Sequence, residues 1–167
     1  LPDFRAAERT FTLLTQVVGR ARRYTNDGKV IIQTYHPGNP TIRMAVQNET
    51  EAFYQNEIDV RKLTGFPPFS RMIRVVLRGK NKGEVQSTIN KLHAQLPPAT
   101  DLPGDCLGPA ECPLGKIAGN FRYQLLFRAS LGPAAGSMHQ LLKQILSSFS
   151  VPKGIFVEVD VDPVHLL

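Results

Sequence analysis

The chain has 167 residues, of which 42% are hydrophobic and 20% are charged, and its formal net charge is +6. This composition is typical of a globular protein with a core, and it excludes wholesale disorder. No apolar run approaches the length of a membrane span and no signal peptide opens the chain, so we expect a cytosolic protein. Basic residues exceed acidic ones over residues 1–23 and again over 67–167, which favours a polyanionic partner such as nucleic acid.

Hydrophobic spacing in the first part of the chain predicts helices over residues 3–18, 41–47 and 49–63. Between the first two, the β-branched run of residues 29–35 predicts a buried strand. Gly65 is expected to end the last helix, because a glycine tolerates the left-handed conformation that follows a helix. The paired prolines within residues 66–70 cannot form regular structure, so we interpret this stretch as a packed linker and boundary.

The pattern after this boundary is more regular. Apolar and β-branched runs predict strands over residues 71–79, 105–111, 120–129 and 155–161, and helical spacing predicts helices over 82–95 and 134–149. The order is strand, helix, strand, strand, helix, strand. This order indicates an α+β fold of the ferredoxin-like βαββαβ type, in which two helices cover one face of a four-stranded antiparallel sheet.

One motif near the start of the chain has the residues of a phosphate clamp. Gln16, Gly19, Arg20 and Arg23 form the pattern Q-x-x-G-R-x-x-R. Guanidinium groups bind phosphate oxygens bidentately, and glycine lets the backbone approach a ligand. Phosphoryl transfer also needs a phosphate-cradling loop, a Mg²⁺ ligand and a residue that positions water, and we find none of these motifs in the sequence. Alternatively, the arginines occupy a solvated helix end and complement its dipole.

Aromatic and basic residues alternate along the predicted strand 120–129. Phe121, Arg122 and Tyr123 are suited to nucleic acid, because aromatic faces stack on bases while arginine neutralises phosphates. The two rings share one face of the strand, so the alternative is that they form core beneath the helices.

The sequence predicts no metal site. Cys106 and Cys112 lack a C-x-x-C pattern and a nearby histidine pair, so we expect reduced thiols in or beside a strand. Asp160 and Asp162 share one face at a strand end, where a turn at the Asp-Pro pair is favoured over a metal-binding pair. The histidines are scattered and form no ligand set.

Several segments, in this order along the chain, resemble the PriA family of bacterial primosomal proteins. They are residues 1–9, 13–17, 53–58, 65–71, 107–110, 122–125 and 159–163. The resemblance covers nearly the whole chain. It implies the C-terminal part of a DNA helicase that restarts stalled replication forks. Residues 1–47 would end the second RecA-like lobe, 48–69 would be a helical linker, and 70–167 would be a ferredoxin-like domain that binds DNA and partners.

The resemblance also implies roles for individual residues. Gln16, Gly19, Arg20 and Arg23 would line the ATP cleft of the intact parent, with Gly19 holding a turn and the two arginines as catalytic fingers. ATP and Mg²⁺ would serve the parent, whose phosphate loop, Mg²⁺ motif and zinc site lie outside this chain. The chain alone is therefore expected to lack ATPase activity. Val18 and Arg22 depart from the family's usual motif, so the alternative is a primosome-loading platform whose motor has degenerated.

For the C-terminal domain, the resemblance implies binding of branched or single-stranded DNA. Lys116, Arg122 and Tyr123 are the candidate DNA-binding residues. The implied protein partners are single-stranded-DNA-binding protein and other primosome proteins. An RNA-binding domain of ribosomal type is a further alternative, which rests on fold analogy alone.

Overall fold

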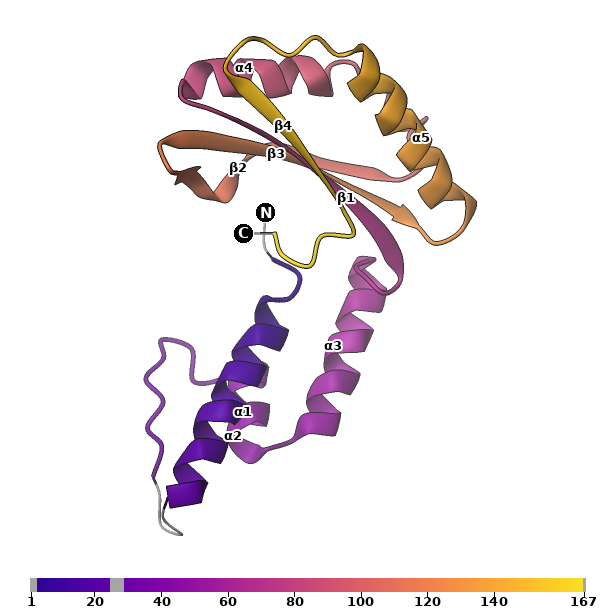
Figure 1. The fold of residues 1–167 in the computed structure, drawn as a ribbon. Helices are drawn as coiled ribbons and strands as arrows, with labels where there is room; N and C mark the ends of the chain where they lie inside the picture. Colours follow the sequence, from indigo (N-terminus) through magenta and orange to yellow (C-terminus); the bar gives the residue numbers. More distant parts are fainter. Residues whose placement is uncertain (1–2, 25–28, 167) are drawn as a thin grey trace. The chain divides into compact units, whose positions relative to one another are not determined.

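The computed structural model describes residues 3–24 and 29–166, and the side chains of residues 22–24 lie outside the described set. The chain divides into two compact units, Phe4–Thr64 and, with the first residues of the chain, Gly65–Leu167. Their elements follow one another along the sequence as coloured in Figure 1. The division falls at Gly65, whose φ of +66° confirms the left-handed glycine expected at a helix end.

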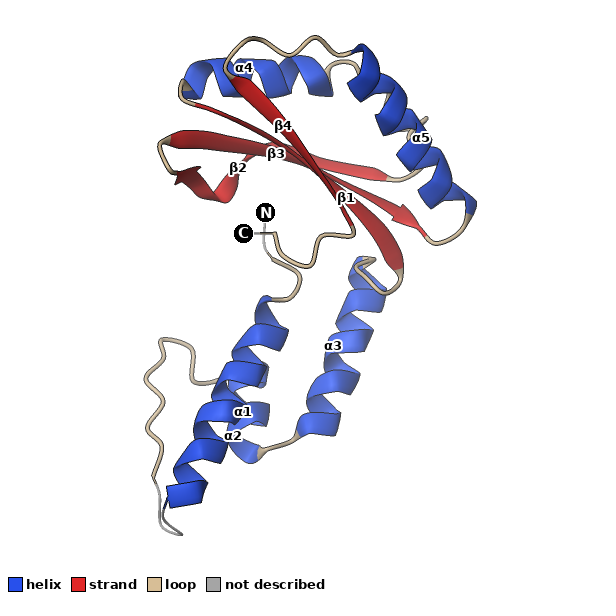
Figure 2. Cartoon of the chain, viewed as in Figure 1, coloured by secondary structure: helices blue, strands red, loops and turns tan. Residues whose placement is uncertain are grey.

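The first unit is helical, as the hydrophobic spacing predicts. Its helices are α1 (Ala6–Tyr24), α2 (Pro40–Gln47) and α3 (Thr50–Thr64), shown in blue in Figure 2. Asn39 caps α2 by accepting a hydrogen bond from the backbone N–H of Thr41. Among the described residues of this unit, the buried core consists of Phe11, Ala45 and Phe53, and the rings of Phe11 and Phe53 stack with centroids 3.9 Å apart. The core of this unit is therefore small.

The predicted buried strand over residues 29–35 is wrong. The structure forms no strand there, and the side chains of Ile31 and Tyr35 are 93% and 99% exposed. A strand needs a neighbour that pairs with its backbone, and no described strand pairs with this segment. The β-branched segment of residues 29–35 therefore has no pairing strand within the described residues.

The second unit has the predicted βαββαβ order. Its elements are β1 (Ser70–Gly79), α4 (Lys82–His93), β2 (Asp105–Ile117), β3 (Asn120–Ser130), α5 (Pro133–Ser148) and β4 (Ile155–Val161). The sheet has the spatial order β2-β3-β1-β4, and each neighbouring pair is antiparallel. Both helices lie on one face of the sheet (Figure 2). The ferredoxin-like fold is therefore confirmed, with β2 longer than predicted.

The core of this unit lies between the sheet and the helices. Alternate residues of β1 and β3 point toward α4 and α5, because successive side chains of a strand face opposite sides. The buried side chains include Val75, Leu77, Leu125 and Phe127 from the strands and Val85, Ile89, Met138 and Leu142 from the helices. Each such side chain contributes roughly 1.5–3 kcal/mol when fully buried.

The opposite face of the sheet carries polar groups. Arg74 of β1 and Gln124 of β3 are both buried, and Arg74 Nε donates a hydrogen bond to Gln124 Oε1 at 2.7 Å. The chain after β4 turns back along this face (Figure 1), where the carbonyl of His165 accepts a bond from Arg74. Asp162 makes the turn, with a φ of +53°, and pairs with Arg71, which confirms the turn predicted at this position.

Both cysteines, Cys106 and Cys112, lie in β2 as free thiols, as predicted. Burial raises the pKa of the Cys106 thiol to about 11, so it stays protonated near neutral pH. Among the described residues, no group of histidine, cysteine and acidic side chains is arranged to hold a metal ion, and no helix is long and apolar enough to cross a membrane.

Candidate nucleic-acid interface

The hairpin between β2 and β3 positions the basic and aromatic residues that the sequence singles out. Ala118 and Gly119 join the strands with φ values of 48° and 80°, which suit a tight hairpin turn. The register then places Lys116 opposite Phe121. β2 departs from regular pairing between Glu111 and Lys116, so the end of this strand is irregular.

Two lysines lie near the ring of Phe121 at this end of the sheet. The Lys116 ammonium is 4.8 Å from the centroid of the ring, and that of Lys82, the first residue of α4, is 6.0 Å away. Lys82 also donates a hydrogen bond of 2.9 Å to Glu111, and this bond raises the pKa of the lysine. The ring and the two cations together form the hairpin tip site, defined by Lys82, Lys116 and Phe121. Cations beside an aromatic face are attracted by its quadrupole.

Arg122 points to the other face of the sheet. It lies directly opposite Arg78 of β1, and its Nη1 donates to the carbonyl of Leu114 at 3.4 Å. Arg78 lies over the ring of Phe156 of β4, 4.7 Å from its centroid, and pairs with Glu158. Like charges facing each other across strands repel, and the Glu158 carboxylate offsets that repulsion. Both guanidinium groups therefore lie at the same end of the sheet face that is opposite the helices, here called the open face.

The structure corrects the expectation for Tyr123. Its ring is only 6% exposed and belongs to the core between the sheet and the helices. A ring in this place cannot stack on a base. The alternative in which one of the two rings is core is thus confirmed for Tyr123, while Phe121 remains partly accessible. Lys116 and Arg122 remain candidates.

Arg78, Lys82 and Phe156 also belong to this region, and no sequence motif singled them out. Strand alternation offered a signal, because Phe156 shares a face with Glu158 and Arg78 ends a strand that pairs with β4. The position of Lys82 depends on how α4 packs on the sheet, which the sequence pattern does not encode.

The Q-x-x-G-R-x-x-R motif lies entirely on α1. Gln16, Gly19 and Arg20 are exposed, and the side chain of Arg23 lies outside the described residues. The helix continues through Gly19 to Tyr24, so the turn expected at Gly19 is not present. A side chain at position 19 would meet open space, and the glycine is therefore not required by packing here. The spacing places positions 16, 20 and 23 along one side of the helix.

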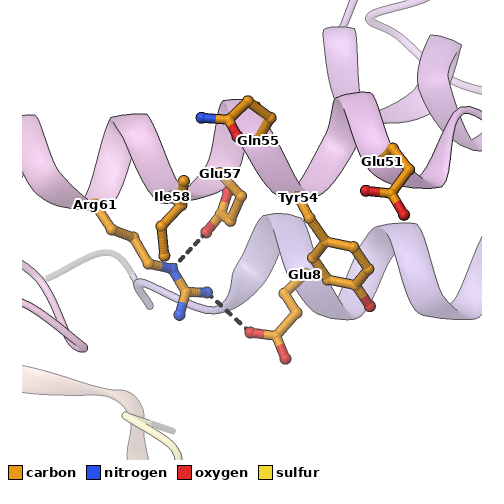
Figure 3. Close-up of a pocket in the computed structure, with 7 residues that line it drawn as sticks. All are labelled: Glu8, Glu51, Tyr54, Gln55, Glu57, Ile58 and Arg61. Atoms are coloured by element: carbon orange, nitrogen blue, oxygen red, sulfur yellow. Dashed lines mark hydrogen bonds and ion pairs between the residues drawn. The ribbon is translucent and has the colours of Figure 1, made fainter.

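The first unit also contains a hollow of about 430 Å³ between α1 and α3 (Figure 3). Arg61 of α3 crosses it, donating to Glu57 at 2.9 Å and to Glu8 of α1 at 2.8 Å. Glu8 also accepts from Arg5, and these bonds lower the pKa of Glu8 to about 2. Arg61 thus pairs with Glu57 of its own helix and with Glu8 of α1. The ion pair with Glu8 joins α1 to α3 across this hollow.

The second unit is thus a ferredoxin-like domain with a basic and aromatic hairpin tip. Residues 62–164 match the family described as "Primosomal protein N C-terminal domain". This match covers more than half of the chain, which therefore belongs to that family.

Curated relatives extend the similarity over the first unit. The chain is 43% identical over 166 residues to the replication restart protein PriA of Treponema pallidum, a match that covers 99% of this chain and 25% of the relative. The corresponding proteins of Borreliella burgdorferi and Bacillus subtilis are both 32% identical, with 100% of this chain covered and 25% and 21% of the relatives. The chain spans about a fifth to a quarter of the length of these proteins.

Proposed function

We propose that this chain is the C-terminal part of a replication-restart protein and that its hairpin tip site binds branched or single-stranded DNA. The family membership and the names of the relatives support the replication-restart role. The observation that carries the DNA-binding proposal is the placement of Lys82 and Lys116 around the ring of Phe121.

The chemistry of the hairpin tip site suits an unpaired strand. The accessible part of the Phe121 ring can stack on any base, and neighbouring cations attract the phosphates on either side. Arg122 and Arg78, at the same end of the sheet, offer further phosphate contacts. Because stacking and charge carry no sequence code, the expected binding is insensitive to sequence and strongly dependent on salt.

The test is a titration of the whole chain with single-stranded and forked DNA at several salt concentrations. Phe121→Leu removes the stacking face and is expected to weaken single-strand binding by roughly tenfold. Lys116→Ala removes a phosphate contact and is expected to lower the slope of log K against log salt by about 1. Lys91→Ala is the matched control, because Lys91 is exposed in the last turn of α4, away from Lys82.

Two outcomes contradict the proposal. One is a loss of affinity in Lys91→Ala as large as that in Phe121→Leu. Such a result shows that DNA is attracted by the net charge of the chain and not by the hairpin tip site. The other is preference for structured RNA over forked DNA at every salt concentration, which favours the alternative of an RNA-binding domain.

We also propose that Gln16, Gly19, Arg20 and Arg23 contribute to the ATP site of an intact parent that binds ATP and Mg²⁺. The exposed side of α1 leaves Gln16 and Arg20 accessible to another part of that protein. The chain alone then hydrolyses no ATP, and DNA-stimulated hydrolysis by it contradicts this proposal. In the parent, Arg20→Ala is expected to abolish hydrolysis. A parent that is already inactive favours the alternative, a loading platform with a degenerate motor.

Protein partners are part of the same proposal. Single-stranded-DNA-binding protein and other primosome proteins are the partners that the family resemblance implies. Calorimetry with purified single-stranded-DNA-binding protein and this chain tests the first of these partners. The absence of a measurable heat of binding contradicts the proposed interaction.

A further inference from the structure

The strand β4 forms one edge of the sheet. The order β2-β3-β1-β4 gives β4 a single neighbour, β1, within the described residues. An edge strand presents backbone N–H and C=O groups that can pair with a strand from another chain. The chain that follows β4 turns onto the open face of the sheet and does not continue along this edge.

A groove accompanies this edge on the side of the helices. α5 packs against β3 and β1 and leaves the end of β4 uncovered, so that Val159 and Val161 are 50% and 45% exposed. The groove has a volume of about 390 Å³. Its apolar lining consists of Ile73, Leu142, Leu146, Val159 and Val161. Such a groove beside a free edge offers pockets for alternate side chains of an added strand.

The two faces of this edge carry opposite charge. On the helix side, Lys143 and His139 of α5 border the groove, and Lys143 makes no ion pair within the described residues. On the open side, β4 presents Glu158 and Asp160. Glu158 pairs with Arg78, whereas Asp160 makes no ion pair within the described residues. An added strand alternates its side chains between the two faces. Its helix-side residues therefore meet apolar groups and a lysine, while its open-side residues meet carboxylates.

We propose that β4 and this groove bind an extended segment of a partner protein as an added strand of the sheet. The segment places apolar and acidic residues on the helix side and basic residues on the open side. A second copy of β4 fits poorly, because Glu158 and Asp160 would face the same carboxylates across the new pair. The edge therefore selects a partner with alternating charge.

The test uses the whole chain and a fluorescent peptide, Val-Lys-Val-Lys-Glu-Lys-Val, followed by anisotropy. Saturable binding is expected. The charge-reversed peptide Val-Glu-Val-Glu-Lys-Glu-Val is expected to bind at least about fivefold more weakly, because each exposed charge pair contributes modestly and several act together. Lys143→Glu is expected to weaken binding of the first peptide by about fivefold, and changing the peptide's glutamate to lysine is expected to restore it.

The control variant is Lys91→Glu, which makes the same charge change on the exposed side of α4 and leaves binding unchanged. Amide hydrogen exchange supplies the readout specific to strand addition, since the amides of Val157, Val159 and Val161 gain protection in the complex. Peptide binding without that protection overturns the proposal, and so does equal weakening by Lys91→Glu and Lys143→Glu. Dimerisation of the chain through β4 in sedimentation experiments also overturns it, in favour of self-pairing.

Discussion

The two units of this chain differ in how completely each buries its own apolar surface. The sheet unit encloses a continuous core between four strands and two helices. Among its described residues, the helical unit buries three apolar side chains and exposes several others, including Leu13, Val17, Ile31, Tyr35 and Val46. A domain must bury its apolar face against another layer. The difference indicates that the sheet unit is self-sufficient, whereas the helical unit leaves much of its described apolar surface uncovered.

The largest effect is expected when the two units are separated from each other. Residues 65–167 alone are expected to unfold cooperatively on heating, because their core lies within that segment. Residues 4–64 alone are expected to show no cooperative transition, since a core with only three buried residues among those described does not offset the entropy of ordering the segment. Circular dichroism melts of both fragments measure this, and a sharp transition in residues 4–64 contradicts it.

The next largest effect is expected in the core of the sheet unit. Phe127→Ala leaves a cavity beneath the helices and is expected to lower the free energy of unfolding by about 3–5 kcal/mol. Phe156→Ala is the control, because that ring is 53% exposed, and its cost is expected to stay below about 1 kcal/mol. Urea unfolding of the whole chain compares the two, and equal costs contradict the assigned core.

A smaller effect is expected in the helical unit, where ion pairs join α1 and α3. Glu8→Gln is expected to cost about 1 kcal/mol at neutral pH, because the pair is partly exposed and screened. Hydrogen bonds from Arg5 and Arg61 lower the pKa of Glu8 from its ordinary value of 4.5 to about 2 in the folded chain. Its contribution is therefore complete above pH 4.5 and is lost as the pH falls toward about 2.

Hydrogen exchange of α1 and α3 as a function of pH measures this contribution. Glu51→Gln is the matched control, since Glu51 borders the same hollow and forms no ion pair within the described residues. An unchanged pH profile in Glu8→Gln refutes the role of the pair.

The smallest effect is expected in the extended segment of the helical unit. Ile31→Ser is expected to change the free energy of unfolding by less than about 0.5 kcal/mol, because the side chain is 93% exposed. The same substitution is expected to reduce self-association, since it removes an apolar residue from an unpaired β-branched segment. Urea unfolding and light scattering measure the two effects, and a large destabilisation shows that the segment is packed.

Local pattern was sufficient for most of the elements. The order of strands and helices in the sheet unit follows from alternation and helical spacing, because these periods reflect which face of each element is buried. Gly65 was likewise predictable, since only a glycine adopts a left-handed φ at low cost. Residues 29–35 show the limit of such a pattern, because a strand also needs a partner that the local sequence does not supply.

The candidate site was less predictable than the fold. Phe121 and Tyr123 share a face of β3. The sequence pattern alone does not show which of these residues the helices bury. Packing places Tyr123 in the core and leaves Phe121 near the hairpin end, beside lysines from two different elements. The buried pair of Arg74 and Gln124 also joins residues far apart in the sequence.

The amino-acid sequence alone predicts the βαββαβ order, the helices of the first unit and the excess of basic charge. These properties depend on residue type and on spacing within single elements. Packing of the folded chain establishes which aromatic ring is accessible, which cations lie near it and which strand forms the edge of the sheet. Those outcomes depend on contacts between residues distant in the chain, where burial and pairing override local preference.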